Sequence, residues 1–243
     1  MLASNSYKCG DDNSCAHYYN ILTIKWKSNL TITYSAGSYA EIYAKLREMR
    51  RIFPGLLNFV TPESITRILP DTFRDCTDIN SIRIPDSVTQ IEDRAFESCM
   101  SLTDIVLPDG MKIIGYEAFE NCKSLASIAI PDGVTRIGSG AFSGCESLSS
   151  IVIPNSVSKI EDSTFRSCTS LKNIVIPESV TEIGGLAFLN CKSLTNIIIP
   201  DSVTRIGNYA FGGCQRSILT ITAPAGSYAH AYAKEHRISF VAK

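Results

Sequence analysis

The chain has 243 residues, of which 44% are hydrophobic and 19% are charged, and this composition excludes an intrinsically disordered protein. The 23 Lys and Arg residues nearly balance the 24 Asp and Glu residues, for a formal net charge of −1, so no basic surface for nucleic acid or an anionic membrane is predicted. No apolar run reaches the ~18 residues of a membrane-spanning helix, so membrane insertion is not expected.

Residues 1–55 form the first predicted module. The opening segment MLASNSYKCGDD contains neither the basic nor the apolar stretch of a secretory signal. Two alternatives follow: the protein stays inside the cell, or this chain is a trimmed piece of a longer one. Further along, apolar residues alternate in Leu22–Trp26 and in Leu30–Tyr34 on either side of a short polar segment, and this pattern predicts a β-hairpin.

The second strand of this hairpin begins a segment that occurs twice. Thr31–Lys45 closely matches Thr220–Lys234 near the other end of the chain. Both copies are predicted to form a strand, a turn and a helix, and the helix of the first copy continues to about Ile52. Two interpretations stay open: the first copy is an N-terminal cap, or it is the end of an earlier repeat array.

Residues 56–223 are built from an internal repeat of 23 residues. The period is carried by seven cysteines, seven prolines and seven phenylalanines: Cys76, Cys99, Cys122, Cys145, Cys168, Cys191 and Cys214; Pro62, Pro85, Pro108, Pro131, Pro154, Pro177 and Pro200; Phe73, Phe96, Phe119, Phe142, Phe165, Phe188 and Phe211. Each unit reads roughly P-D-S-V-T-x-I-x-x-x-A-F-x-x-C-x-S-L-x-x-I-x-I, and the last has one extra residue near Gln215–Ser217. An even step of this kind indicates a repeat rather than a disulfide framework.

Two short apolar stretches are predicted within each unit. Alternation in Ile105–Leu107 and its equivalents indicates a strand of three or four residues. Pro108 follows, lacks a backbone N–H and ends that strand. Val134 and Ile137, after a Pro-Asp-Gly turn, represent a second inward-facing stretch.

The remaining part of the unit repeats Phe, Cys and Leu at intervals of three residues, as in Phe142, Cys145 and Leu148. This spacing predicts a helical or 3₁₀ turn with one buried side. A single unit cannot bury its apolar face, whereas stacked units can. We therefore predict an α/β repeat solenoid with short parallel strands on the concave side, short helical or 3₁₀ turns on the convex side, stacked Phe side chains, and a cap at each end.

Residues 224–243 are predicted to form the C-terminal cap. Ser227 is a suitable N-cap for a short helix that contains Tyr228 and Tyr232. Ile238–Val241 then indicates a final strand.

The repeat resembles a known family. The stretch that begins at Leu102 nearly reproduces the leucine-rich repeat pattern L-x-x-L-x-L-x-x-N-x-L, with Ile105, Leu107 and Gly110 in the next marked places and Met111 one position early. Together with the recurring Pro, Ala-Phe and Cys-x-Ser-Leu, it resembles BspA-like leucine-rich repeats. The resemblance implies a solenoid, and it implies cell-surface or secreted proteins that bind host proteins or other cells.

Few residues suggest chemistry. The repeats contain no histidine, since His17, His230 and His236 lie in the end modules, and the periodic cysteines are predicted to be small buried hydrophobes. Cys9 and Cys15, with His17, have three interpretations: metal ligands, a disulfide or free thiols. No catalytic residue, metal site or cofactor is assigned from these patterns.

An acidic column also follows the period, and it is interpreted as a solvated column of turns rather than a calcium site. Its members are Glu63, Asp86, Asp109, Asp132, Glu178 and Asp201. The G-G-x-G-x-D pattern of calcium-binding β-rolls is absent from the sequence.

The concave face is the predicted binding surface. Between the two inward positions of each strand, one outward column contains Arg83, Val106, Ala129, Val152, Val175, Ile198 and Thr222. Two residues earlier, a second column contains Ser81, Asp104, Ser127, Ser150, Asn173, Asn196 and Thr220. We predict that Arg83, Asp104, Val106, Ala129, Val152, Asn173, Val175, Asn196 and Ile198 contact a partner. Two alternatives stay open: β-propensity alone favours Val and Ile, or a neighbouring chain or a cap covers the stripe.

These features predict a non-catalytic binding module for another protein, with a role in protein–protein interaction or adhesion. A host or cell-surface protein is the expected partner, and a second copy of the chain is a further candidate. The main alternative is a surface glycan, which is disfavoured because the inferred strands present no aromatic residue on the concave face. An enzyme with a site in the terminal modules is the weaker alternative, because no polar cluster interrupts the repeat.

Overall fold

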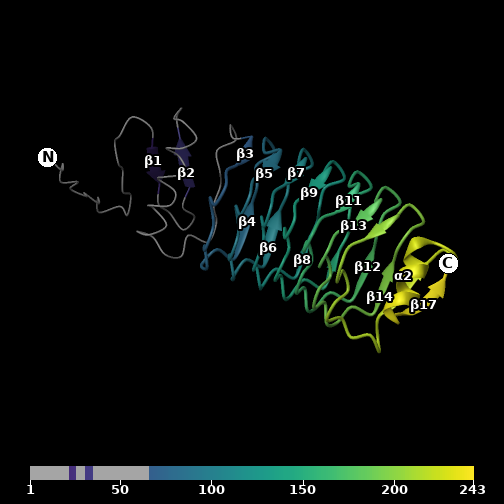
Figure 1. The fold of residues 1–243 in the computed structure, drawn as a ribbon. Coiled ribbons are helices and arrows are strands. Elements are labelled where there is room, and N and C mark those ends of the chain that lie inside the picture. The colour runs from purple at the N-terminus through teal and green to yellow at the C-terminus, as the bar shows by residue number, and fades with distance from the viewer. Residues whose placement is uncertain (1–21, 26–30, 35–65) are drawn as a thin grey trace.

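The computed structural model describes residues 22–25, 31–34 and 66–243. Within residues 66–243, each repeat forms one turn of a solenoid, and successive turns lie side by side along one axis (Figure 1). A single turn exposes most of its apolar residues, so burial requires the turns on either side. The predicted repeat solenoid is confirmed.

Each turn contributes a strand to each of two parallel series. Ile82 pairs with Ile105 in the first series, and Ile68 pairs with Ile91 in the second, so equivalent residues of successive repeats lie side by side. The first series consists of β4 (Ser81–Arg83), β6 (Asp104–Val106), β8 (Ser127–Ile128), β10 (Ser150–Ile151), β12 (Asn173–Val175), β14 (Asn196–Ile198), β16 (Thr220–Ala223) and β17 (Ser239–Ala242). The second consists of β3 (Arg67–Ile68), β5 (Gln90–Ile91), β7 (Ile113–Ile114), β9 (Arg136–Ile137), β11 (Lys159–Ile160), β13 (Glu182–Ile183) and β15 (Arg205–Ile206). The sequence indicated the second series only as an inward-facing stretch.

The Ala-Phe-x-x-Cys segment is a run of hydrogen-bonded turns rather than a helix. The N–H of Cys122 donates to the C=O of Phe119 (3.2 Å), and the N–H of Leu125 donates to the C=O of Cys122 (3.1 Å), which explains the three-residue spacing. Glu117 and Asn121 have φ angles of 51° and 58°, in the left-handed region. Such residues interrupt a right-handed helix. The expected helical or 3₁₀ turn is therefore divided into separate turns.

A column of phenylalanine rings runs through the core beside these turns. From Phe73 to Phe211, successive ring centroids lie 4.9–5.8 Å apart, and neighbouring rings are inclined by 14° or less. Ile, Leu and Val residues of both strand series fill the rest of the core. The predicted Phe stack is confirmed, and it extends through all seven repeats.

The N-terminal hairpin is also confirmed. Strands β1 (Leu22–Lys25) and β2 (Thr31–Tyr34) pair antiparallel, with Leu22 opposite Tyr34. The helix predicted to continue to about Ile52 lies outside the described residues, so the two interpretations of this module stay predictions.

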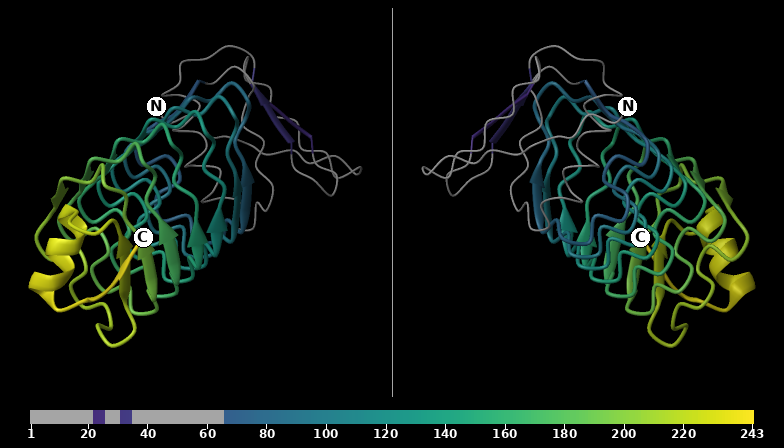
Figure 2. Two further views of the ribbon diagram at one scale, coloured as in Figure 1. Left: turned by 90° about the vertical axis from the view of Figure 1, so that its right-hand side faces the viewer. Right: turned by 90° about the vertical axis from the view of Figure 1, so that its left-hand side faces the viewer.

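Helix α2 (Tyr228–His236) lies at the C-terminal end of the stack, next to the last strands (Figure 2). Ser227 caps it as predicted, because its hydroxyl accepts the N–H of His230 (3.2 Å). Tyr232 packs edge-on against Phe211, with the ring centroids 5.9 Å apart, and this contact ends the Phe column. No helix among the described residues is long and apolar enough to span a membrane.

We expect Phe142→Ala to lower the free energy of unfolding by about 3–5 kcal/mol. The Phe142 ring is fully buried between Phe119 and Phe165, so its removal leaves a cavity and weakens two interfaces between turns. Differential scanning calorimetry should show a lower transition temperature or a transition split in two.

Tyr209→Ala is the matched control, because Tyr209 is an aromatic residue with 71% of its surface exposed. We expect it to change the free energy of unfolding by no more than about 0.5 kcal/mol. Small and equal effects of the two substitutions would contradict a core that depends on the Phe column.

Candidate interaction surface

The outward residues of the first strand series form an exposed apolar stripe. Strand residues alternate between the core and solvent, so Ile105 is 4% exposed whereas its neighbour Val106 is 44% exposed. The exposed fraction reaches 78% at Val152 and 59% at Val175. We define the apolar stripe as the outward residues of five consecutive turns: Val106, Ala129, Val152, Val175 and Ile198. Of these, all but the half-buried Ile198 are exposed.

A column of small polar residues borders the apolar stripe, two residues earlier in each turn. Asp104 and Asn173 are exposed, and Asn196 is half-buried. The hydroxyl of Thr222 donates to Oδ1 of Asn196 (3.1 Å) across neighbouring turns. The column therefore offers hydrogen-bonding groups beside an apolar surface, as the sequence predicted.

Strand β17 adds one more turn to this surface. Val241 pairs with Thr222, and Ser239 pairs with Thr220. Val241 is 52% exposed, so it continues the outward column beyond the residues that the sequence indicated. Arg83 begins that column on β4, where it is exposed and lies 3.8 Å from Asp86.

The acidic column lies at the surface. Its described members are exposed: Asp86, Asp109, Asp132, Glu178 and Asp201. In residues 66–243, no three His, Cys, Asp or Glu side chains come together in a group that could hold a metal ion. The arrangement is that of solvated turns.

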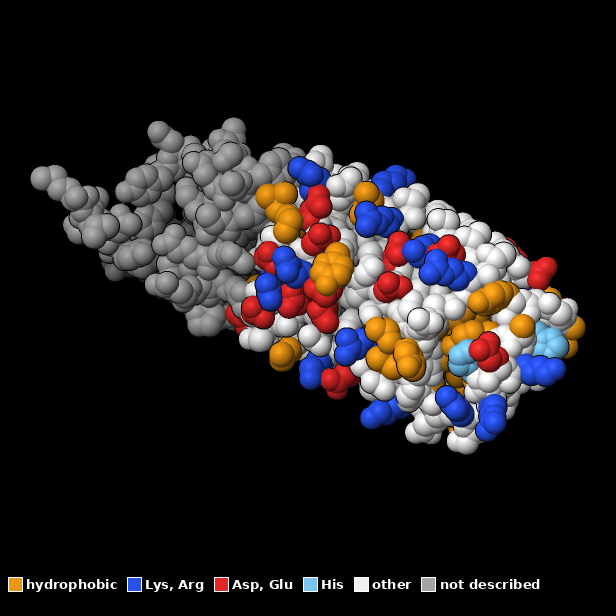
Figure 3. Space-filling model, in the orientation of Figure 1, with side chains coloured by type: hydrophobic (Ala, Val, Ile, Leu, Met, Phe, Trp, Pro, Cys, Tyr) orange, Lys and Arg blue, Asp and Glu red, His pale blue; other side chains and the backbone are white. Residues whose placement is uncertain are grey.

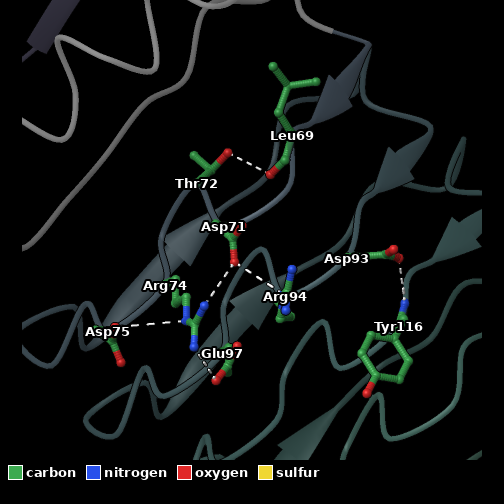
Figure 4. A network of polar contacts seen from close by, with 9 residues as sticks. All are labelled: Leu69, Asp71, Thr72, Arg74, Asp75, Asp93, Arg94, Glu97 and Tyr116. Carbon is green, nitrogen blue, oxygen red and sulfur yellow. Dashed lines mark hydrogen bonds and ion pairs between the residues drawn. The ribbon is translucent and has the colours of Figure 1, made fainter.

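Charged side chains gather over the first described turns (Figure 3). Arg74 lies among three carboxylates, 3.1 Å from Glu97, 3.5 Å from Asp71 and 3.9 Å from Asp75 (Figure 4). Arg94 of the next turn is 3.3 Å from the same Asp71 carboxylate. The opposite charges therefore link neighbouring turns rather than forming a set of paired carboxylates for acid–base catalysis.

Two further contacts tie this region together. Oδ1 of Asp93 accepts the backbone N–H of Tyr116 (2.8 Å) in the next turn. Burial raises the pKa of Glu120, and repulsion from Glu117 raises it further, while the hydroxyl of Ser143 donates to its carboxylate (3.3 Å). Each of these two carboxyl groups therefore accepts a hydrogen bond from the next turn, Asp93 from the backbone and Glu120 from a side chain.

The periodic cysteines form a hydrogen-bonded ladder. The thiol of Cys145 donates to the C=O of Phe119 in the preceding turn (3.2 Å), and that C=O also accepts the N–H of Cys122. Six thiols bond in this way: Cys99, Cys122, Cys145, Cys168, Cys191 and Cys214. All seven periodic cysteines are buried, which confirms the prediction, and none of the six thiols in this ladder is in a disulfide.

These thiols are poor candidates for nucleophilic catalysis. Burial raises the pKa of Cys145 and of Cys168 well above the usual range, and raises that of Cys214 to about 11. The reactive form of cysteine is the thiolate, which burial disfavours. Cys9, Cys15 and His17 lie outside the described residues, so their three interpretations stay predictions.

Residues 54–145 and 89–218 match a protein-family model described as a BspA type leucine rich repeat region with 6 copies. The chain is similar to the crystal structure of a T. pallidum leucine rich repeat protein, with 24% identity over 98% of this chain and 96% of that one, and a TM-score of 0.64. It is also similar to a leucine-rich repeat protein from Bacteroides ovatus, with 25% identity over 87% of this chain and a TM-score of 0.54. This chain spans 62% of the length of the B. ovatus structure. No curated protein matches the sequence.

We expect stability to fall as the pH rises above about 8.5, and to go on falling toward pH 11, because the pKa of Cys214 is raised to about 11 in the folded state. The pKa of each thiol in the ladder, from Cys99 to Cys214, is higher in the folded state, so above about pH 8.5 the unfolded chain loses thiol protons that the folded chain keeps. Each such thiol lowers the free energy of unfolding by up to about 1.4 kcal/mol per pH unit. Urea unfolding at a series of pH values measures the slope.

Cys145→Ala is the informative variant for this slope. It lowers the free energy of unfolding at every pH because it removes packing. At alkaline pH, however, the free energy of unfolding should fall less steeply than in the parent, by up to about 1.4 kcal/mol per pH unit, because one thiol fewer titrates. An unchanged slope in this variant, or rapid labelling of the native thiols by a maleimide, would contradict the buried, protonated ladder.

Proposed function

The chain belongs to the BspA-type leucine-rich repeat family, and we propose that it is a non-catalytic module that binds another protein through the apolar stripe. Leucine-rich repeat proteins of this kind are generally non-catalytic, and the repeat fold itself suggests a protein-interaction module. The observation that carries the proposal is the run of apolar outward residues on five consecutive turns.

The size and border of the apolar stripe suit a protein partner. At ~4.8 Å per turn, five turns present a strip on the order of 20 Å long. Contiguous exposed apolar surface with a polar rim is typical of protein interfaces. The column that contains Asp104 and Asn173 supplies such a rim on one side of the stripe.

The second strand series argues against β-propensity as the sole cause of the apolar stripe. Its outward residues also lie on short parallel strands at the surface, yet six of the seven are polar or charged: Arg67, Gln90, Arg136, Lys159, Glu182 and Arg205. The seventh is Ile113. Propensity for strands would act equally on both series. Apolar outward residues predominate only in the first series, and this difference supports a surface that a partner covers when it binds.

We place the partner on a host cell or another cell, so that binding contributes to adhesion, as the family resemblance implies. A surface glycan is less favoured, because none of the described outward residues of the first series is aromatic. Sugar rings are commonly held against aromatic faces, and here the outward residues are Val, Ala, Ile, Thr and Arg.

We expect Val152→Glu combined with Val175→Glu to weaken partner binding about 100-fold. Each substitution removes a Val side chain that the bound partner would bury, at a cost of about 1.5 kcal/mol of binding free energy, or about 3 kcal/mol together. A photo-crosslinking amino acid at position 152 first captures and identifies the partner. Titration calorimetry with the purified partner then gives the affinity of the parent and the double variant.

Arg136→Gln with Arg205→Gln is the matched control. It changes the net charge by the same amount, but on the second strand series, and it should leave the affinity unchanged. If the Val152/Val175 double variant folds normally and binds the captured partner with the parent's affinity, the apolar stripe is not the binding site.

A further inference from the structure

Strand β17 ends the first series with an open edge. The N–H of Lys243 donates to the C=O of Ala223 (3.0 Å), so positions 239, 241 and 243 direct their backbone groups toward β16. Alternate residues of a strand direct theirs to the opposite edge, so Phe240 and Ala242 direct their N–H and C=O groups away from β16. Among the described residues, no strand lies on that side of β17.

Helix α2 covers only part of the end of the stack. Its Tyr232 covers the last ring of the Phe column, and its His230 stacks on Phe240 with the ring centroids 4.1 Å apart. Phe240 is the last inward residue of the first series, and it is only half-buried. Ile221, which pairs with it on β16, is completely buried. The strand edge and part of its apolar side are thus still available for one more strand.

Nothing in β17 opposes the addition of a strand. Its sequence, Ser-Phe-Val-Ala, contains no proline and no charged residue, which are the features that commonly protect an edge. The strand that pairs with β17 inside the chain is β16, with the sequence Thr-Ile-Thr-Ala.

The chain contains a second copy of the strand that pairs with β17. Strand β2 reads Thr-Ile-Thr-Tyr, and the residues that follow it repeat those that follow β16. Neither β2 nor β17 has a charged residue, so no like charges meet when they pair. In the described residues, β2 pairs with one strand, β1.

We propose that the open edge of β17 binds β2 of a second copy of this chain, in parallel, with Thr31 beside Ser239 and Thr33 beside Val241. The residues of β17 would thus have the same neighbours in sequence on both edges, since β16 places Thr220 beside Ser239 and Thr222 beside Val241 on the other edge. Seven steps of ~4.8 Å separate β4 from β17. The β2 strand of the same chain would therefore reach this edge only if the segment between β2 and β4 ran along more than about 30 Å of the stack. A second copy meets no such demand. The contact joins two different surfaces and therefore builds head-to-tail chains or rings.

Self-association of the full chain is the first test. Sedimentation equilibrium should give an average mass above that of one chain, and the mass should increase with concentration. Ala242→Pro removes an N–H from the open edge and keeps those of Val241 and Lys243 toward β16. This variant should remain a single chain with an unchanged thermal transition. A parent that stays a single chain at every concentration, or a folded Ala242→Pro variant that associates like the parent, overturns the proposal.

A cross-link tests the register independently of how Ala242→Pro folds. An isotope-labelled chain with Thr33→Cys is mixed with an unlabelled chain with Val241→Cys, and Cys9 and Cys15 are replaced by Ser in both. Mild oxidation should link position 33 of a labelled chain to position 241 of an unlabelled one. Val175→Cys replaces Val241→Cys as the control, since Val175 is exposed on the same sheet away from the edge, and it should not link.

Three outcomes of this experiment overturn the proposal. A disulfide between two copies of position 241 would mean that β17 pairs with itself in a symmetric dimer. If no such link forms between the two chains, while a further variant that carries both Thr33→Cys and Val241→Cys links within one chain, the edge is filled by the chain's own β2. The absence of any link between copies, while the parent associates, would place the contact elsewhere, and none of these results affects the stripe proposal.

Discussion

Backbone hydrogen bonds between turns place every residue next to its own counterpart, at a step of ~4.8 Å. A repeat position is therefore suited only to residues that tolerate contact with their like. Phe rings meet this demand by stacking. Glycine meets it where turns approach most closely, since a Cβ on Gly138 would lie 2.6 Å from the carbonyl carbon of Gly115. Opposite charges meet it at Lys159, Glu182 and Arg205, whose neighbouring groups lie 3.6 and 3.8 Å apart.

The same constraint accounts for the cysteine column. A buried hydroxyl without a partner would be costly, whereas a thiol is small, largely apolar and a weak donor. From Phe73 to Phe188, the C=O of each column Phe accepts one N–H from its own turn, and its second lone pair accepts the thiol of the next turn. The column therefore fills space and completes the hydrogen bonding of a buried carbonyl group at once.

Periodicity revealed most of the fold, because each buried column is one residue type repeated at one spacing. It did not reveal the second series as strands, since a two-residue strand such as β9 has no alternation to detect. Left-handed residues were recognisable only in part: Asn121 and Gly144 are types that favour this conformation, whereas Leu186 and Tyr209 are not.

The candidate surface followed from alternation within the strands, but its continuation at Val241 did not, because the step from Thr222 to Val241 departs from 23 residues. The identity of a partner is a different kind of information. The repeat pattern reflects contacts between turns, whereas a partner would contact the exposed outward residues such as Val152 and Val175.

The extra residue of the last repeat shows where the period is permitted to change. Asn196 pairs with Thr220, a step from 196 to 220 of 24 residues. The additional residue is absorbed because the N–H groups of Ile218 and Leu219 both donate to the C=O of Gln215 (3.0 Å), in a loop whose residues 215–218 are exposed. In an inner repeat, the same insertion would shift a loop against neighbours on both sides. Inner repeats are thus expected to be gained and lost in evolution as whole units, while small insertions and deletions accumulate in the final one.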